Sequence, residues 1–588
     1  MEKFVKISSI LLLSSSFVVG EALAAVNPKD TSAAIASSDR YNRSSIAKEI
    51  TSESHRKKQE EGRGASKYLK KKLSKISWSQ HKRISRIEIR GNKSIDSKEI
   101  KSIVRPYLKG GVTKKELHII TDRIEKYYRD EGYYLPVAHA SISGSILKLR
   151  VVEGKIKNVI VVLNNEKRDK KVLSNQLFLN LIGQIEKATP IKTRDLERYL
   201  LLINKIHGYT VDYELEPLKN IKGNEIANLV MMVEETQKGL ASISVDNAGT
   251  SDLGKHQFTL ASQIFNPIAN DSLIINAGSS DKPKRFKMIT AGYLKRLNSY
   301  GTSASIFASY LEDDPYYTSG SKDSKSTVIR GRLDQYVVLN NDYSVKLEAG
   351  AEKRDMKYYS KEIKTMEYNY VMGSLGGKMK IVDMLGVENW FYPYYNWAIN
   401  KVSYKKNSIN ERNFDKNFNF FIVDWYRNQP LPKDLSLFLK ASYQYTDKDL
   451  PLEHMYSTGT AHTGRGYKTG LVSSDRGISG TAELRYTKEF EAEKIKKFLE
   501  TGQIFGFYDV THFIKHNKDD TRKRHKDAVY FDKSTLPSAG VGIRLFFAHN
   551  FYGEGTAEYP LVKNIEVNGT KNKNKPLYRF LLSKEFTW

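Results

Sequence analysis

The stretch that decides the fold is YRFLLSKEFTW, residues 578–588. Large apolar side chains occupy every second position except one, where a lysine stands: Tyr578, Phe580, Leu582, Lys584, Phe586 and Trp588. Successive side chains of a β-strand point to opposite sides, so this alternation predicts a strand with one long apolar face. A soluble β-sandwich rarely needs so long an apolar face, and the pattern favours a strand that faces lipid.

The same alternation recurs through residues 239–588. It is clearest in DLSLFLKASYQY (434–445) and TAELRYTK (481–488), and weaker in TSASIFASYL (302–311). Strands of about 10 residues with one apolar and one polar face are typical of transmembrane β-barrels. Because no later apolar run reaches about 18 residues, a membrane helix is not expected there. The sequence therefore predicts a transmembrane antiparallel β-barrel over 239–588.

The amino-acid composition excludes some kinds of site and suggests kinds of partner. The 588 residues include no cysteine, which excludes disulfides, thiolate zinc sites and cysteine nucleophiles. The net charge of +28 suggests nucleic acid as a partner. An export signal would argue against it, because an exported protein does not meet genomic DNA, and acidic lipid headgroups or an acidic protein would then be better candidates.

The N-terminus carries such a signal. Lys3 and Lys6 precede an apolar run from Ile7 to Val19, and Ala22-Leu23-Ala24 follows. A basic segment, a short apolar segment and an A-x-A site are the three parts of a secretory signal peptide, which we expect to span residues 1–24. A buried helix near the start is the alternative. No nucleic-acid partner is expected.

Residues 25–82 are polar and contain little that could form a core. Within them, residues 44–61 lack Gly and Pro and are dense in Lys, Arg, Glu and Ser, which is compatible with a solvated helix. A disordered tail is an equally good interpretation.

From residue 83 to residue 236 an element order occurs twice. In 83–154, Asp96 and Glu99 begin a helix that Pro106 should stop, and Thr113 with Glu116 forms a capping box for a second helix. In 155–236, a helix is expected over 170–182, and Thr193 is expected to cap the next one. Both halves read β-α-α-β-β, which predicts two α+β domains rather than one irregular domain.

Together these features resemble the two-partner secretion transporters, also called hemolysin-activator or TpsB-type proteins. RDLERYLLLINKIHGYTV (194–211) is similar to the long helix of their second POTRA domain, and SVDNAGTSDLGKHQ (244–257) and FNPIANDSL (265–273) to the start of their barrel. The final strand resembles the C-terminal targeting signal of bacterial outer-membrane proteins. The resemblance implies 16 barrel strands in the outer membrane and two periplasmic POTRA domains, 83–154 and 155–236.

In this family a long loop returns into the barrel with an arginine at its tip. The matching motif here is Gly464-Arg465-Gly466-Tyr467, within an inward-folding segment at about 449–476. The resemblance also implies an aspartate partner on the wall, matched by Phe507 and Asp509. Gly464 and Thr511 depart from the family pattern, which has Val and Gly at these positions. A phosphate-binding loop is excluded because the order G-x-x-x-x-G-K-[ST] is absent.

The physics supports an Arg465–Asp509 pair. A guanidinium binds a carboxylate through two hydrogen bonds and keeps its charge. Glycines on both sides allow a tight turn close to the wall, and a wet lumen would spare the pair most of the cost of burial. The alternative is one more exposed arginine in a basic protein.

The resemblance implies a pore rather than an enzyme, with no catalytic residue, metal or cofactor. Its partner would be a secreted TpsA-type exoprotein of hemolysin or adhesin type, which the pore exports and in some relatives activates, and residues 44–61 would be a plug helix. Further expected partners are outer-membrane lipids and lipopolysaccharide, for which the basic cluster 522–526 is a candidate, and the barrel-assembly machinery and periplasmic chaperones during biogenesis. Counting strands back from Trp588 places 449–476 and 514–537 outside the cell.

Three alternatives remain open. A barrel-assembly or insertion factor of the same superfamily usually carries more POTRA domains than this chain has room for. A porin or adhesin would not need the two repeated domains. A barrel enzyme would need a catalytic constellation, but the twelve histidines are scattered and form no H-E-x-x-H motif.

Overall fold

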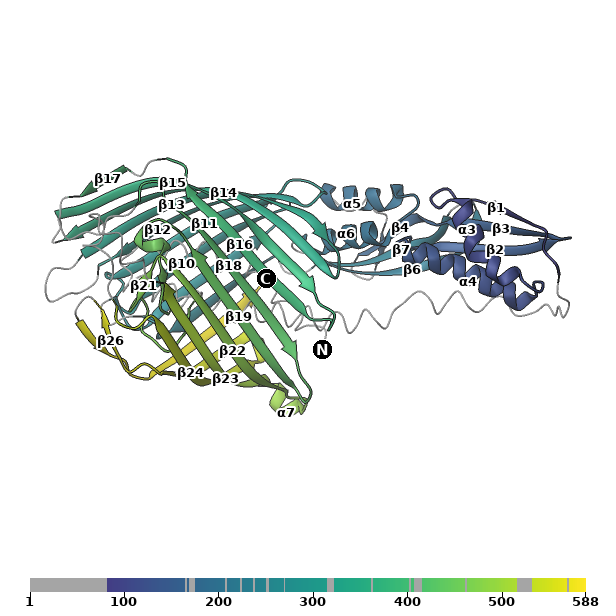
Figure 1. The fold of residues 1–588 in the computed structure, drawn as a ribbon. Coiled ribbons are helices and arrows are strands. Elements are labelled where there is room, and N and C mark those ends of the chain that lie inside the picture. The colour runs from purple at the N-terminus through teal and green to yellow at the C-terminus, as the bar shows by residue number, and fades with distance from the viewer. Residues whose placement is uncertain are drawn as a thin grey trace. The chain divides into compact units, whose positions relative to one another are not determined.

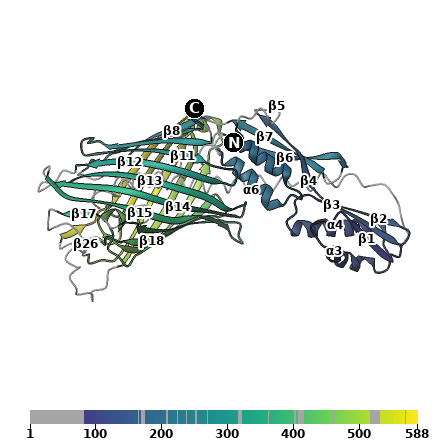
Figure 2. The same ribbon diagram turned by 90° about the horizontal axis from the view of Figure 1, so that it is seen from above.

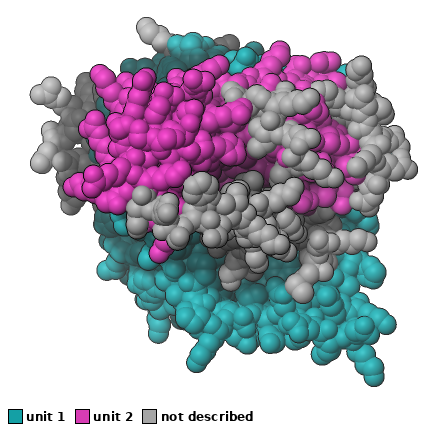
Figure 3. Space-filling model, turned by 90° about the vertical axis from the view of Figure 1, so that its right-hand side faces the viewer, with its two compact units in different colours: residues 1–58, 237–338, 342–588 teal, residues 59–236, 339–341 magenta. Residues whose placement is uncertain are grey.

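The computed structural model describes residues 82–588 except 164–165, 169–174, 207–208, 223–224, 236–237, 250–252, 269, 315–321, 361–362, 401–402, 407–414, 460–462, 515–530 and 568–569. The expected signal peptide with Ala22 and Ala24, the polar tail and the segment 44–61 lie outside these residues. The chain forms two compact units, whose described residues are 82–235 with 339–341 in one and 238–338 with 342–588, the barrel, in the other (Figure 3). Each is described by itself.

The first domain of the N-terminal unit is a three-stranded sheet with its helices on one face (Figures 1 and 2). Strand order is β1-β3-β2, and β1 runs parallel to β3. Its elements are β1 (Arg86–Arg90), α3 (Ser97–Val104), η3 (Arg105–Leu108), α4 (Lys114–Asp130), β2 (Pro136–Ser143) and β3 (Ile146–Glu153). Apolar side chains of both helices and the sheet fill its core, among them Ile100, Val104, Ile120, Ile124, Leu147 and Leu149.

Local sequence signals account for most of its helix ends. Asp96 caps α3 by accepting from the Lys98 amide, and Thr113 and Glu116 form the predicted capping box of α4. α3 ends at Val104, just before Pro106, where the sequence predicted that the helix would stop. The chain then continues directly into the short helix η3, because proline is tolerated in the first turn of a new helix.

A buried carboxylate ties this domain together. Glu153, 1% exposed, accepts hydrogen bonds from the Lys93 and Ser94 amides (2.8 and 2.7 Å), from the Ser94 hydroxyl (2.9 Å) and from the Tyr128 hydroxyl (3.1 Å). Burial, and then the adjacent Glu153 carboxylate, raises the pKa of Tyr128 well above its usual range, so its hydroxyl remains a donor.

The second domain repeats the element order with one extra short strand. It contains β4 (Lys155–Leu163), β5 (Glu166–Arg168), α5 (Gln176–Lys187), α6 (Thr193–Asn204), β6 (Tyr209–Lys222) and β7 (Glu225–Glu235), in the sheet order β5-β4-β7-β6. The two domains share main-chain hydrogen bonds, including Tyr134 amide to Ile191 carbonyl (3.0 Å) and Thr193 amide to Gly132 carbonyl (2.9 Å).

Two sequence predictions about these helices were wrong. The helix expected at 170–182 begins at Gln176, because Asn175 caps it by accepting from the Phe178 amide, and it extends to Lys187. Thr193 does not cap α6. Lys192 is the N-cap residue, without a side-chain cap, and Thr193 already belongs to the helix while its amide binds the first domain.

The second unit is a closed antiparallel barrel. Its strands are β8 (Gly239–Asp246), β9 (Gln257–Phe265), β10 (Asp271–Ser280), β11 (Phe286–Arg296), β12 (Thr302–Asp313), β13 (Lys322–Leu339), β14 (Tyr343–Ser360), β15 (Ile363–Val382), β16 (Glu388–Ala398), β17 (Ser403–Lys406), β18 (Asn419–Pro430), β19 (Leu435–Tyr445), β22 (Arg476–Glu489), β23 (Leu499–Ile514), β24 (Thr535–Phe547), β25 (Phe551–Pro560) and β28 (Leu577–Thr587). Because β16 and β17 pair with successive parts of β15, they form one strand, so the barrel has 16. The predicted count is confirmed.

Alternation along the strands separates the two faces of the wall. On β19, Leu437, Leu439 and Tyr443 face outward, whereas Lys440 and Ser442 are buried on the inner side. Apolar side chains elsewhere on the outer face are exposed, for example Ile289, Leu347, Leu484 and Ile543. Among the described residues, none of the helices is both long and apolar enough to span a membrane.

The last strand closes the barrel by pairing antiparallel with β8, from Leu581 opposite Asp246 to Thr587 opposite Leu240. On its apolar face Tyr578, Leu582, Phe586 and Trp588 are exposed and Phe580 is half-buried. The Gly239 amide donates to the Trp588 carbonyl (3.2 Å), and a Cβ on Gly239 would lie 2.5 Å from the Trp588 ring. A glycine is therefore needed where the barrel closes.

Candidate functional site in the barrel lumen

Between β19 and β22 the chain turns back and folds as a hairpin against the inner wall. Its described elements are η5 (Leu452–His454), β20 (Tyr456–Ser457) and β21 (Ser473–Ser474). The limbs pair with each other, and the Thr458 hydroxyl donates to the Lys468 carbonyl (2.9 Å) and accepts from the Val472 amide (3.2 Å). We call residues 452–459 and 463–474 the lumen loop.

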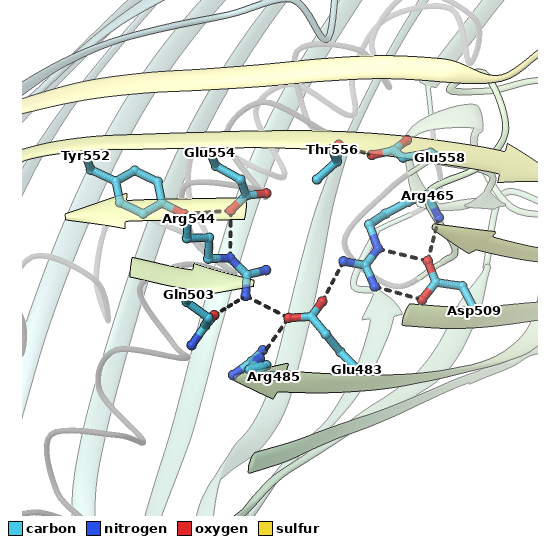
Figure 4. A network of polar contacts seen from close by, with 10 residues as sticks. All are labelled: Arg465, Glu483, Arg485, Gln503, Asp509, Arg544, Tyr552, Glu554, Thr556 and Glu558. Atoms are coloured by element: carbon cyan, nitrogen blue, oxygen red, sulfur yellow. Dashed lines mark hydrogen bonds and ion pairs between the residues drawn. The ribbon is translucent and has the colours of Figure 1, made fainter. Parts of the chain in front are cut away.

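At its tip, Arg465 contacts Asp509 on β23 through three donors (Figure 4). Nε and Nη2 of Arg465 donate to Oδ2 and Oδ1 of Asp509 at 3.0 and 3.1 Å, and the Arg465 amide donates to Oδ2 at 3.0 Å. Among the described residues, the hydrogen bonds to the Asp509 carboxylate come from Arg465. The guanidinium lies over the Phe507 ring, 3.5 Å from its centroid. The structure thus brings together the three residues that the sequence singled out.

A second carboxylate connects the tip to a larger network. Glu483 on β22 accepts from Arg465 (2.7 Å), Arg544 (2.7 Å) and Arg485 (2.8 Å) (Figure 4). Arg544 also donates to Glu554 (2.9 Å) and to Gln503 (2.7 Å). The tip therefore joins a polar network whose other members, Glu483, Arg485, Arg544, Glu554 and Gln503, all belong to strands of the wall.

The sequence analysis expected a wet pair, and here it was wrong. Arg465 is 8% exposed, Asp509 0% and Glu483 2%. Charges this deeply buried are tolerated because each guanidinium faces carboxylates at hydrogen-bonding distance, which offsets the loss of hydration.

The two glycines of the tip are needed for close approach. A Cβ on Gly466 would lie 2.4 Å from the Ser538 Cβ, and one on Gly464 would lie 3.0 Å from the Asp509 Cβ. The left-handed conformations of the loop occur instead at Gly459 (φ 73°) and Gly470 (φ 67°). The expected tight turn is thus displaced from the tip to the limbs of the loop.

The two departures from the family pattern contact each other. The Gly464 amide donates to the Thr511 hydroxyl at 3.1 Å. A side chain at residue 464 would point toward Asp509, Ser538 and Thr511, the last 3.6 Å from its Cβ. The absence of a side chain at 464 and the presence of one at 511 are therefore complementary.

Tyr467 extends the tip to the next strands. Its hydroxyl donates to the Pro537 carbonyl (2.7 Å) and accepts from the Val562 amide (3.1 Å). Tyr467 belongs to an apolar cluster with Tyr456, Phe513 and Phe531, joined by Ile565 and Val567 of the hairpin β26 (Asn564–Val567) and β27 (Thr570–Lys573). The basic cluster 522–526 lies outside the described residues.

A second anchor, which the sequence analysis missed, holds the base of the loop on another wall. Glu453 accepts from the Tyr368 and Tyr370 hydroxyls of β15 (2.8 and 2.7 Å), and the Tyr370 hydroxyl is 2.8 Å from Nε2 of His454. His454 packs against the rings of Phe418 and Phe420. We call this set the base anchor.

One side-chain amide binds both limbs of the loop at its base. The Gln444 side chain on β19 donates to the His454 carbonyl (2.8 Å) and to the Asp475 carbonyl (3.1 Å). Asp475 in turn accepts from the Leu450 amide (2.9 Å). The loop is thus fastened at its tip and at its base by different residues.

Weak signals pointed to some of the missed residues. The alternation of TAELRYTK places Glu483 and Arg485 on the polar face, but nothing in the sequence aligns them with residue 465. That alignment depends on strand register, which sets Glu483 opposite Phe507 on β23. Within the described part of the chain, His, Asp and Glu form no group of three or more that could hold a metal ion.

Comparisons with known proteins were made for sequence and for structure. Residues 227–545 match the family described as haemolysin secretion/activation protein ShlB/FhaC/HecB, and residues 83–154 match the ShlB-type POTRA domain. The heme/hemopexin transporter protein HuxB of Haemophilus influenzae strain ATCC 51907 is 21% identical over 496 residues, covering 81% of this chain and 83% of that protein.

Solved structures show a similar fold. CdiB from Escherichia coli aligns with a TM-score of 0.73 at 18% identity, covering 95% of this chain and 99% of that one. CdiB from Acinetobacter baumannii aligns with a TM-score of 0.60 at 12% identity, covering 92% and 98%.

Proposed function

The chain belongs to the haemolysin secretion/activation family ShlB/FhaC/HecB, and from this premise we propose that the lumen loop is the gate of its pore. Membership makes the protein an outer-membrane pore of two-partner secretion, with POTRA structure on the periplasmic side and a secreted exoprotein as its partner.

The observation that carries the proposal is the attachment of Arg465. It reaches two carboxylates on two strands while its own amide binds Asp509, so this one residue ties the tip to two strands of the wall through several bonds. If the tip leaves, Glu483 keeps Arg485 and Arg544, whereas the Asp509 carboxylate loses its donors and must gain water from the lumen in their place. The loop can then release without disrupting the barrel.

We infer the remaining steps of secretion from membership of the family. A periplasmic exoprotein of hemolysin or adhesin type would add an extended segment to an edge strand of the N-terminal unit, for which β2 and β6 are available. The segment 44–61 would plug the resting pore. Folding of the cargo outside the cell would give direction, and lipopolysaccharide would meet the basic extracellular loops. The barrel-assembly machinery and periplasmic chaperones would act during biogenesis.

The test of the gate is Arg465→Ala. We expect the open fraction in bilayer recordings to rise at least about tenfold, since a charge-assisted contact of this kind is worth 1.4 kcal/mol or more. Secretion of the partner should fall, because the tip can no longer return to its docked position on the wall. Heat-modifiable migration on gels should show a folded barrel. Lys468→Ala changes an exposed cation of the same loop and should secrete normally. Normal secretion by the Arg465 variant would show that the loop is not the gate.

A barrel-assembly or insertion factor of the same superfamily is the nearest alternative, and a porin or adhesin barrel is a more distant one. Deleting the gene distinguishes them: secretion of one large exported protein should stop while other outer-membrane proteins keep their levels. A general loss of outer-membrane proteins would favour the assembly factor.

A further inference from the structure

The inner wall of the barrel has two unlike parts. On β13 to β25, ion pairs follow one another across the strands, among them Arg330–Glu352, Arg332–Glu348 and Arg544–Glu554. On β8 to β12, the inward-facing side chains that the structure describes are charged only near strand ends, at Asp246, Asp313 and Arg296. Between these ends lies an uncharged surface.

This surface contains polar atoms with unsatisfied hydrogen bonds. Among the described residues, six inward-facing side chains on β9, β10, β12 and β13 are at most 7% exposed and carry a nitrogen or oxygen with no partner: Gln257, Gln263, Ser272, Asn276, Ser305 and Ser326. We call these six the uncharged panel. Neither amide atom of Gln257 or of Asn276 is bonded.

For Asn276, the directly opposite residues cannot supply the missing bonds. Asn276 lies opposite Ala261 on one side and Thr290 on the other, and the Thr290 hydroxyl is already bonded to Ser309 (2.9 Å). Folded proteins pair the great majority of buried polar groups, because an unpaired one costs folding free energy. A group of them on one wall therefore points to a ligand that supplies the missing bonds.

The chemistry of the uncharged panel selects the ligand. Amide side chains offer both a donor and an acceptor without charge, which is what the peptide backbone requires. On β10 two members, Ser272 and Asn276, are four residues apart, and on β9 two, Gln257 and Gln263, are six apart. These separations are two and three times the repeat of about 6.8 Å that an extended chain has. We propose that the uncharged panel binds the backbone of the polypeptide in transit, in extended form and independently of its side chains. This inference rests on the pore function and deepens it.

This proposal explains why the inner wall has a charged part and an uncharged part. The charged part holds the lumen loop through Asp509 and Glu483. A cargo that passed along fixed charges would be retained or repelled according to its own charges. Along the uncharged panel, segments of either sign meet the same neutral partners, so a large protein of mixed composition can pass.

The test uses the purified full-length protein in planar lipid bilayers. The probe is a 30-residue peptide of Gly, Ser and Thr, added on the periplasmic side, and the measurement is the duration of the current blockades that it causes. The variant is Gln257→Leu with Asn276→Leu, which removes the unpaired atoms at similar volume. We expect the blockades to be about tenfold shorter. The fraction of the barrel that unfolds on heating should stay at the parent's level or fall, because unpaired buried polar atoms have been removed.

Matched controls separate recognition from structural damage. Asn396→Leu makes the same exchange on the inner face of β16, in the charged part of the wall, and should leave the blockades unchanged. A peptide with sarcosine in place of glycine lacks backbone donors, so it should give short blockades in the parent and no further change in the variant. Should the double leucine variant not fold, Ser272→Ala with Ser305→Ala removes two hydroxyls and should shorten blockades about threefold.

Two results would overturn the inference while the pore function stands. In the first, the panel variant folds and its blockades last as long as the parent's, as expected if the uncharged panel holds only water. In the second, Asn396→Leu shortens the blockades as much as the panel variant does. A parent that carries no current, or that no peptide blocks, would instead overturn the pore function and the inference with it.

Discussion

Two of the almost fully buried carboxylates of this protein, Glu153 and Glu483, have surroundings that differ in kind. Glu153, in the first domain, is held by two backbone amides and two hydroxyls of its own domain. Glu483, in the barrel, is held by three guanidinium groups, one of which belongs to the lumen loop. The neutral partners form a fixed connection, because the loss of any one leaves a buried charge with fewer donors. The three cations provide redundancy, so one of them can leave.

The difference follows from what surrounds each region. The first domain has an apolar core and tolerates one buried charge only where neutral donors are aimed at it. The barrel reverses this arrangement, with apolar side chains outside and charged ones inside. Because the interior contains charges of both signs, Glu483 keeps two cations when the third leaves, and a movable loop requires this property.

The largest predicted effect tests the fixed connection. Glu153→Ala leaves two amides and the Tyr128 hydroxyl without their acceptor, and we expect the first domain to lose about 3 kcal/mol of stability. Tryptic cleavage within residues 83–154 of the full-length protein, followed against urea concentration, measures this loss. Glu131→Ala, at an exposed position of the same domain, is the control. Unchanged cleavage would mean that the buried carboxylate is not a fixed connection.

An intermediate effect is expected at the base anchor. Tyr368→Phe with Tyr370→Phe removes both hydroxyls that donate to Glu453 while keeping the rings. The docked loop should lose about 1–2 kcal/mol, seen as about a tenfold larger open fraction in bilayer recordings.

Tyr358→Phe is the matched control for the base anchor. It stands on the same wall, and its hydroxyl lies 3.4 Å from that of Tyr368. If the open fraction rose equally in the control, the effect would belong to the wall and not to the loop.

The smallest effect concerns the complementary pair at the tip. Gly464→Val should crowd Asp509, Ser538 and Thr511 and loosen the loop by about 1 kcal/mol. Adding Thr511→Gly should recover most of this loss, because it removes one of the crowded side chains. Open fractions of the two single variants and the double variant give the coupling energy. Additive effects would show that the two positions do not compensate each other.

Much of the fold could be predicted from local patterns. Alternation in stretches such as 434–445 and 578–588 specifies strands with a lipid-facing side, and the capping box at Thr113 and Glu116 specifies where α4 begins. These signals depend on residues close together in the chain. The errors arose where a distant partner intervened, as at Thr193, whose amide binds the Gly132 carbonyl.

The candidate site divides in the same way. Arg465 and Asp509 could be named from a family resemblance, and the structure brings them into contact. Their deep burial, and the arginines that surround Glu483, could not be named, because contacts between strands depend on register.

By itself, the sequence determined that this chain builds two α+β domains and a barrel with a polar interior, because period-two and period-3.6 patterns are written locally. Only the tertiary structure decided which inward-facing residues meet. Closure of β28 on β8 sets the position of every strand around the wall, and with it the separation of the ion-paired part from the uncharged panel. That separation depends on residues hundreds of positions apart, so no local pattern could contain it.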